Sequence, residues 1–231
     1  MRVAVLASGG GTNLQSLLDR FNVGGPSVAR VELVVGSRAG IGALERAERA
    51  GVPATVLALR EMGAEAYTAA LLAELDRHRV ELVVLAGFLQ LVPAEVVERY
   101  AGRMINIHPA LLPAFGGVGM YGMRVHRAVI ESGARVTGAT VHHVSEEYDS
   151  GAIIAQWPVP VLPGDTPGAL AARVLAVEHR LLPLVVEEFA RGAAPPVQPL
   201  ADPVAFDLAP RAAPAEESVR GIAVFGGTGD G

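Results

Sequence analysis

The sequence predicts an α/β fold with a doubly wound, mostly parallel sheet and, toward the C-terminus, an antiparallel pair of strands. Short apolar runs alternate with helical repeats of leucine over the first half of the chain, as in successive βαβ units. The run at residues 81–86 is almost continuously apolar, which is typical of a parallel strand covered on both faces. After residue 116 a glycine-rich loop and two extended runs replace this alternation.

The expected elements follow in order along the chain. Parallel strands are expected at residues 2–7, 31–36, 54–58, 81–86 and 104–108, with helices between them at 14–21, 44–50 and 67–78. The second half is expected to contain a helix near 125–132, the antiparallel strands 138–144 and 152–159, and a final helix at 167–191. Pro183 is expected to kink or break this last helix, because proline lacks the N–H that a helix interior needs.

Two regions differ in composition. Residues 1–195 contain all of these elements and are expected to form one domain around a single core. Ala and Pro dominate residues 196–231, and we expect a mobile tail there.

Composition also excludes several classes of function. The net charge of −5 argues against binding to nucleic acids or membrane surfaces, and no apolar run reaches the roughly 18 residues of a membrane span. Because cysteine is absent, disulfides and thiol catalysis are excluded, and a cytoplasmic enzyme is expected. All 19 basic residues are Arg, which excludes a Schiff-base lysine and a Walker phosphate loop. No metal-ligand motif such as His-Glu-x-x-His occurs, so no metal site is predicted.

The turn at residues 8–13, Ser-Gly-Gly-Gly-Thr-Asn, lies at the carboxyl end of the first predicted strand, where open α/β sheets bind ligands. Its glycines allow a close backbone approach, and the helix that follows offers free N–H groups to a phosphate. Thr12 and Asn13 add side-chain donors. The dinucleotide fingerprint needs a glycine where Leu14 stands, so a monophosphate is favoured over NAD. The alternative is a turn that only connects strand to helix.

A polar pair, Asn106 and His108, closes the fifth predicted strand, and strand alternation puts both side chains on one face. An amide can donate to a developing oxyanion, and a histidine can transfer a proton near neutral pH. The alternative is a hydrogen-bonded core pair. In the next extended run Thr140 and His142 share one face, and the loop after it contains Asp149. This acid could orient His108 and favour its imidazolium form.

Together these segments resemble the formyltransferase family. The resemblance covers about residues 1–195 and rests on the segments at 7–14, 85–88, 106–113, 138–142 and 149–154 and on Glu178-His179. It implies a Rossmann-like formyltransferase fold and a reaction of purine biosynthesis. In that reaction the formyl group of 10-formyltetrahydrofolate moves to the amine of glycinamide ribonucleotide.

The resemblance also implies the residues that bind each substrate. Gly11, Thr12 and Asn13 are expected to hold the ribose phosphate, and Glu178 the ribose hydroxyls. The folate pocket is expected to lie between residues 145–149 and four consecutive residues, Leu89, Gln90, Leu91 and Val92, with Asn106 also in contact.

Catalytic roles follow from the same resemblance. Asn106 is expected to stabilise the tetrahedral oxyanion and His108 to be the general acid toward the folate leaving group. Asp149 is expected to raise the pKa of His108, with His142 and Thr140 in support. We expect small-molecule substrates only, and a monomer or homodimer.

Three positions depart from residues that are common in the family. Gln90 and Ala64 stand where many relatives have Arg, and Gly116 stands where proline is common. We therefore expect weaker folate contacts and a more mobile loop at 116–117. Methionyl-tRNA formyltransferase and formyltetrahydrofolate deformylase, which share the Asn–His–Asp set, are expected to need a further domain. A non-catalytic nucleotide sensor is a last alternative, and it would not need a proton donor.

Overall fold

The computed structural model describes residues 1–25 and 27–192, and the predicted tail at 196–231 lies outside them. The strands are β1 (Arg2–Ala7), β2 (Arg30–Gly36), β3 (Ala54–Val56), β4 (Leu82–Leu85), β5 (Met104–His108), β6 (Val136–His143) and β7 (Ile153–Pro160). The helices are α1 (Thr12–Phe21), α2 (Gly42–Arg49), α3 (Leu59–Met62), α4 (Ala64–Arg77), α5 (Ala94–Arg99), α6 (Met123–Glu131) and α7 (Pro167–Ala190). Among the described residues, no helix is long and apolar enough to cross a membrane.

The strands form one seven-stranded sheet in the order β3-β2-β1-β4-β5-β6-β7. The pairs from β3 to β5 are parallel, whereas β6 is antiparallel to both β5 and β7. This arrangement confirms the predicted fold class, including the C-terminal antiparallel pair. The strand order reverses direction between β1 and β4, and the crevice at such a switch point is where open α/β sheets bind ligands.

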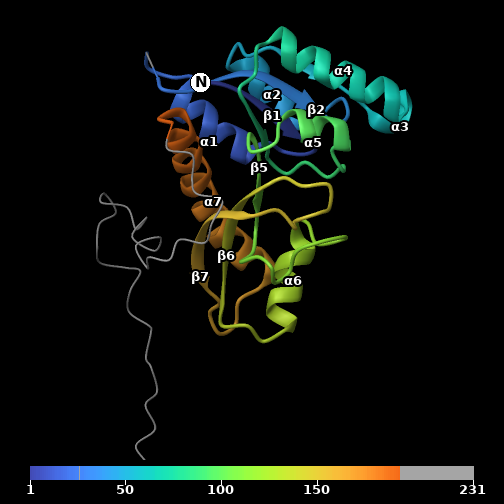
Figure 1. Ribbon diagram of the computed structural model, residues 1–231. Coiled ribbons are helices and arrows are strands. Elements are labelled where there is room, and N and C mark those ends of the chain that lie inside the picture. The colour runs from blue at the N-terminus through green and yellow to red at the C-terminus, as the bar shows by residue number, and fades with distance from the viewer. Residues whose placement is uncertain (26, 193–231) are drawn as a thin grey trace, which may run out of the picture. The chain divides into compact units, whose positions relative to one another are not determined.

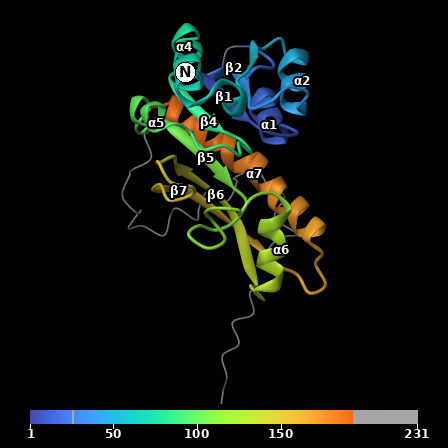
Figure 2. The same ribbon diagram turned by 90° about the vertical axis from the view of Figure 1, so that its right-hand side faces the viewer.

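Helices cover both faces of the sheet, with α1 and α7 on one face and α4 and α5 on the other (Figures 1 and 2). Strand β1 shows why its sequence is apolar throughout. Val3 and Val5 pack into the core under α1 and α7, while Ala4 and Leu6 pack into the core under α4 and α5. Because alternate side chains are buried on opposite faces, neither face of the strand tolerates a polar residue.

Two details of the helices were not predicted correctly. The short helices α3 and α5 were missed, because four and six residues are too few to show a helical repeat. Of the kink or break predicted at Pro183, the break does not occur, because α7 continues through this residue. Pro183 is buried, and α7 packs along α1, β6 and β7, so tertiary packing maintains the helix despite one lost backbone hydrogen bond.

Candidate active site

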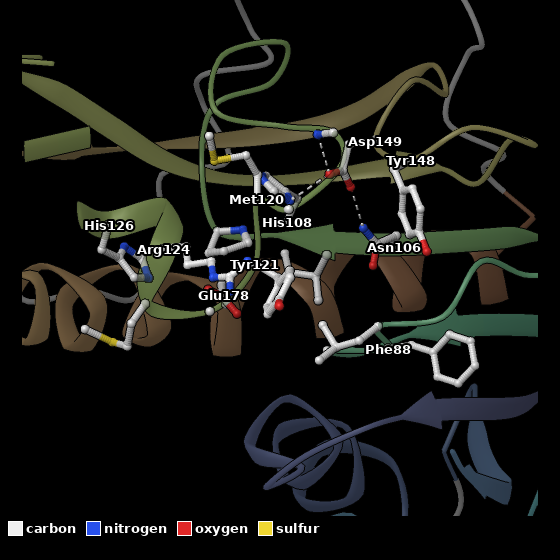
Figure 3. A pocket seen from close by; sticks show the side chains of 18 of the residues that line it. Phe88, Asn106, His108, Met120, Tyr121, Arg124, His126, Tyr148, Asp149 and Glu178 are labelled. Atoms are coloured by element: carbon white, nitrogen blue, oxygen red, sulfur yellow. Dashed lines mark hydrogen bonds and ion pairs between the residues drawn. The ribbon is translucent and has the colours of Figure 1, made fainter. Parts of the chain in front are cut away.

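A cavity of about 610 Å³ opens at the carboxyl ends of β1, β4 and β5 (Figure 3). Its wall includes Asn13 from the glycine turn, Asn106 and His108 from β5, and Glu178 from α7. A smaller cavity of about 50 Å³ lies against residues 90–92. Four residues border both cavities: Phe88, Asn106, Tyr148 and Asp149. The two spaces therefore meet at Asn106 and Asp149, two polar residues that the sequence analysis predicted for the site.

The glycine turn is held in place by backbone contacts. The Ser8 N–H donates to the Gly87 carbonyl at 3.0 Å, which joins the ends of β1 and β4. Gly11 is the N-cap residue just before α1 and has a φ of 72°, and a Cβ there would lie 2.6 Å from the Ala43 Cα. Only glycine fits this position, because of both the positive φ and the close approach of α2. No side chain caps α1, so its first N–H groups stay available to an anion.

A hydrogen bond between Asn13 and Glu178 connects helix α1 with helix α7. The Asn13 Nδ2 donates to the Glu178 Oε2 at 2.6 Å, and the Asn13 Oδ1 is buried without a partner. Burial raises the pKa of Glu178, and the hydrogen bond from Asn13 lowers it only in part. Of the residues predicted to bind the ribonucleotide, these two border the larger cavity, whereas Gly11 and Thr12 do not.

His108 has both ring nitrogens close to protein oxygens. Its Nε2 lies 2.8 Å from the Phe115 carbonyl, and its Nδ1 lies 3.5 Å from the Asp149 Oδ2. A carbonyl only accepts, so Nε2 carries a hydrogen and Nδ1 is the edge that gains or loses a proton. Phe115 has a φ of 57°, a left-handed conformation that turns its carbonyl toward the ring.

Asp149 accepts two further hydrogen bonds in the same place. Its Oδ2 accepts from the Gly117 N–H at 2.9 Å, and its Oδ1 accepts from the Asn106 Nδ2 at 3.4 Å. Burial raises the pKa of Asp149, but the two nearby histidines and the Gly117 N–H outweigh burial and lower it. A Cβ on Gly116 would lie 2.5 Å from the Leu112 Cδ2, so a glycine there also lets the loop pack closely.

Two opposing effects act on the pKa of His108. Burial lowers the pKa, and the Asp149 carboxylate and the Phe115 carbonyl raise it by less. The predicted upward effect of Asp149 is therefore present, but burial outweighs it. Only 3% of His108 is exposed, and the sequence pattern did not indicate this burial.

His142 and Thr140 act through their neighbours. The His142 Nδ1 donates to the His143 carbonyl at 2.8 Å, so its Nε2 accepts from the Asn106 Nδ2 at 2.9 Å and fixes that amide. Thr140 is fully buried and borders neither cavity. It donates to the Ala110 carbonyl at 2.6 Å and accepts from the Leu112 N–H at 3.0 Å, which holds the segment after His108.

The four residues predicted to line a folate pocket divide between the cavities. Leu89 borders the larger one, whereas Gln90, Leu91 and Val92 border the smaller one. The Gln90 Oε1 is buried without a hydrogen-bond partner. Three residues of the loop after β6 form the opposite wall: Ser145, Glu147 and Tyr148.

The sequence reasoning missed the wall contributed by the start of α6. Tyr121, Arg124 and His126 border the larger cavity. Burial and, to a lesser degree, nearby His108 lower the pKa of His126. The only signal in the sequence was the glycine-rich loop that precedes these residues. No group of three or more His, Cys, Asp or Glu that could hold a metal ion occurs among the described residues.

Comparisons with known proteins agree on one family. The model of the formyl transferase family matches residues 1–186. Phosphoribosylglycinamide formyltransferase of Escherichia coli (strain K12) is 39% identical over 193 residues, covering 83% of this chain and 88% of that protein. The chloroplastic phosphoribosylglycinamide formyltransferase of Arabidopsis thaliana is 45% identical over 187 residues, covering 80% of this chain. The chicken (Gallus gallus) trifunctional purine biosynthetic protein adenosine-3 is 43% identical over 194 residues, covering 84% of this chain.

The length of the match differs among these relatives. This chain spans 64% of the Arabidopsis protein and 19% of the chicken protein. Among solved structures, glycinamide ribonucleotide transformylase 1 from Symbiobacterium toebii superimposes with a TM-score of 0.77 at 43% identity. That match covers 83% of this chain and 88% of the Symbiobacterium chain.

Proposed function

The chain belongs to the formyl transferase family, and we propose that it transfers the formyl group of 10-formyltetrahydrofolate to the amine of glycinamide ribonucleotide in purine biosynthesis. One observation carries this proposal: two cavities meet at Asn106 and Asp149, with His108 beside them. A transfer between two bound molecules needs such a junction, because the reacting atoms must come within about 3–3.5 Å of each other.

The larger cavity binds the ribonucleotide in this proposal. The free N–H groups at the start of α1 and the glycine turn hold the phosphate. Glu178 accepts hydrogen bonds from the ribose hydroxyls. In support, its side chain is buried and its carboxylate has a single hydrogen-bond partner among the described residues, Asn13, so it retains acceptor capacity.

The smaller cavity receives the pteridine ring of the formyl donor. Gln90 supplies an unpartnered acceptor there, and Leu91 and Val92 supply an apolar wall. A volume of about 50 Å³ holds only a few water molecules, so residues 145–148 move outward to admit the ring while Asp149 stays beside His108. The bound donor carries the formyl group on a nitrogen that becomes the leaving group.

Asn106 stabilises the oxyanion that forms when the ribonucleotide amine attacks the formyl carbon. One N–H of its amide donates to His142 at 2.9 Å, which fixes the plane of the amide. The other N–H makes only a long contact of 3.4 Å with Asp149. This second N–H is the donor for the oxyanion, because a weak contact is readily exchanged for one with a full negative charge.

His108 donates the proton that the leaving nitrogen needs. Its Nε2–H is held by the Phe115 carbonyl, so the Nδ1 edge transfers the proton. The 3.5 Å between Nδ1 and the Asp149 Oδ2 is longer than a good charge-assisted hydrogen bond. A substrate atom can therefore compete with Asp149 for this proton. The attacking amine releases one proton to water as the new carbon–nitrogen bond forms, which balances the proton gained by the leaving nitrogen.

A turnover assay tests the proposal. The purified protein is mixed with 10-formyltetrahydrofolate, with and without glycinamide ribonucleotide, and release of the deformylated folate is followed by absorbance. We expect release only when the ribonucleotide is present. Release without it would instead identify a deformylase, and tight ribonucleotide binding without release would identify a sensor. The cytoplasmic location, the monomeric or homodimeric state and the absence of nucleic-acid partners stay predictions.

A further inference from the structure

Among the described residues that border the larger cavity, Arg124 is the one with a permanent positive charge. It lies near the start of α6. The same wall carries two carboxylates, Asp149 and Glu178, and two histidines whose pKa values burial lowers. A phosphate dianion in this cavity would therefore meet two negative groups and, apart from Arg124, no fixed positive charge.

Arg124 has unused donors. Its backbone N–H donates to the Tyr121 carbonyl at 3.2 Å, but its side chain makes no hydrogen bond or ion pair with any residue of the described ranges. The guanidinium lies over the Tyr121 ring, 4.9 Å from the ring centre. Stacking on an aromatic face orients a guanidinium and leaves its five N–H groups at the edge. Arg124 and Glu178 lie together in Figure 3, on the side of the cavity away from Tyr148 and Phe88.

A second observation at this end of the cavity also indicates a ligand. His126 is 5% exposed and borders the cavity, and its Nδ1 is buried without a hydrogen-bond partner. Such an unsatisfied group is costly unless a bound molecule completes it.

We propose that Arg124 binds the phosphate of the ribonucleotide, from the side opposite the glycine turn. This proposal rests on the proposed function and names the positive charge that the substrate site otherwise lacks. A guanidinium matches phosphate through two parallel N–H···O bonds, which a backbone turn alone does not provide. The carboxylates of the folate tail are the competing anion. The position of Arg124 disfavours them, because the smaller cavity borders Phe88 and Tyr148 at the other end.

The test compares two substrates and two variants. The substrates are glycinamide ribonucleotide and glycinamide riboside, which lacks the phosphate. The variants are Arg124→Gln and, as a matched control, Arg127→Gln, since Arg127 is exposed on the same helix and borders neither cavity. Arg124→Gln is expected to lower kcat/KM for the ribonucleotide by roughly 10- to 100-fold, mainly through KM, as for a lost charge-assisted hydrogen bond.

Removing the phosphate should abolish this difference. Wild type and Arg124→Gln are expected to use the riboside equally poorly, and Arg127→Gln should match wild type with both substrates. An equal loss with both substrates, or a rise in KM for 10-formyltetrahydrofolate alone, would overturn the assignment. If wild type shows no turnover, the proposed function fails, and calorimetry with ribose 5-phosphate against ribose then tests Arg124 by itself. If the Arg124→Gln variant still binds ribose 5-phosphate more tightly than ribose, by the same factor as wild type, the inference is wrong.

Discussion

Replacing Asp149 with asparagine removes the negative charge beside His108 and changes little else. The two side chains have the same shape, and asparagine adopts the φ of 54° at this position at least as readily as aspartate. The retained carbonyl oxygen can still accept from the Gly117 N–H. The substitution therefore removes the charge that lies 3.5 Å from the His108 Nδ1, together with the long contact of 3.4 Å in which the Asp149 Oδ1 accepts from the Asn106 Nδ2.

The size of this interaction follows from the distance and the burial. Two unit charges 3.5 Å apart attract by about 5 kcal/mol at an effective dielectric constant near 20, and by about 1 kcal/mol in water. The side chains are only 4% and 11% exposed, so the value for this pair lies above the water limit. Burial already lowers the pKa of His108, and losing Asp149 lowers it further. We expect kcat/KM at pH 7 to fall about 100- to 1,000-fold, because fewer molecules carry the proton.

The assay is the pH dependence of kcat/KM together with an NMR titration of His108. In the variant, the limb on which activity falls with rising pH should move to lower pH, because a general acid works only when protonated. Glu146→Gln is the control, since Glu146 is an exposed acid in the same loop. A His108 titration that does not move, with kcat/KM within a factor of two of wild type, would refute the reasoning.

Four further predictions concern binding and stability. Glu178→Gln should raise the free energy of unfolding by about 1–2 kcal/mol in denaturant titrations, because the new amide N–H can donate to the Asn13 Oδ1, which has no partner. The same substitution should weaken ribonucleotide binding, because the carboxylate acceptor is lost. A lower stability of the variant would contradict this prediction. Gln90→Met should raise KM for 10-formyltetrahydrofolate about tenfold and leave KM for the ribonucleotide unchanged, since methionine keeps the length of the side chain but loses the amide with its buried Oε1 acceptor. Gly151→Ala should cost about 1–3 kcal/mol of stability, because its Cβ would overlap the His143 carbonyl, and a wild-type melting temperature would count against it. Tm should be highest above about pH 6.5 and should fall as the pH is lowered, because the unfolded chain then binds protons that the folded protein does not. Burial lowers the pKa of four histidines in the folded protein: His108, His126, His143 and His179.

The sequence was most informative where one residue type satisfies one local requirement. The apolar run of β1 could be interpreted directly, because a strand buried on both faces admits few polar residues. The glycine at position 11 could also be interpreted, because a positive φ and a close contact with α2 leave no room for a side chain. Asn106 and His108 were found because strand alternation places both at one end of β5.

What the sequence did not reveal depends on contacts between distant segments. The Phe115 carbonyl reaches His108 only because the loop after β5 folds back, and no local pattern encodes that. The net pKa of His108 depends on burial by several elements as well as on Asp149, and the sequence pattern indicated only the effect of the acid. Arg124 was missed because the glycine-rich loop before it has no repeat that indicates where α6 lies.

A crystal structure with glycinamide ribonucleotide and a folate analogue that lacks the formyl group tests the central claim most directly. We expect the phosphate against the first N–H groups of α1 and the amine beside Asn106 and His108, with the pteridine ring against residues 90–92. A phosphate bound outside this cavity, or an amine beyond the reach of His108, would contradict the account.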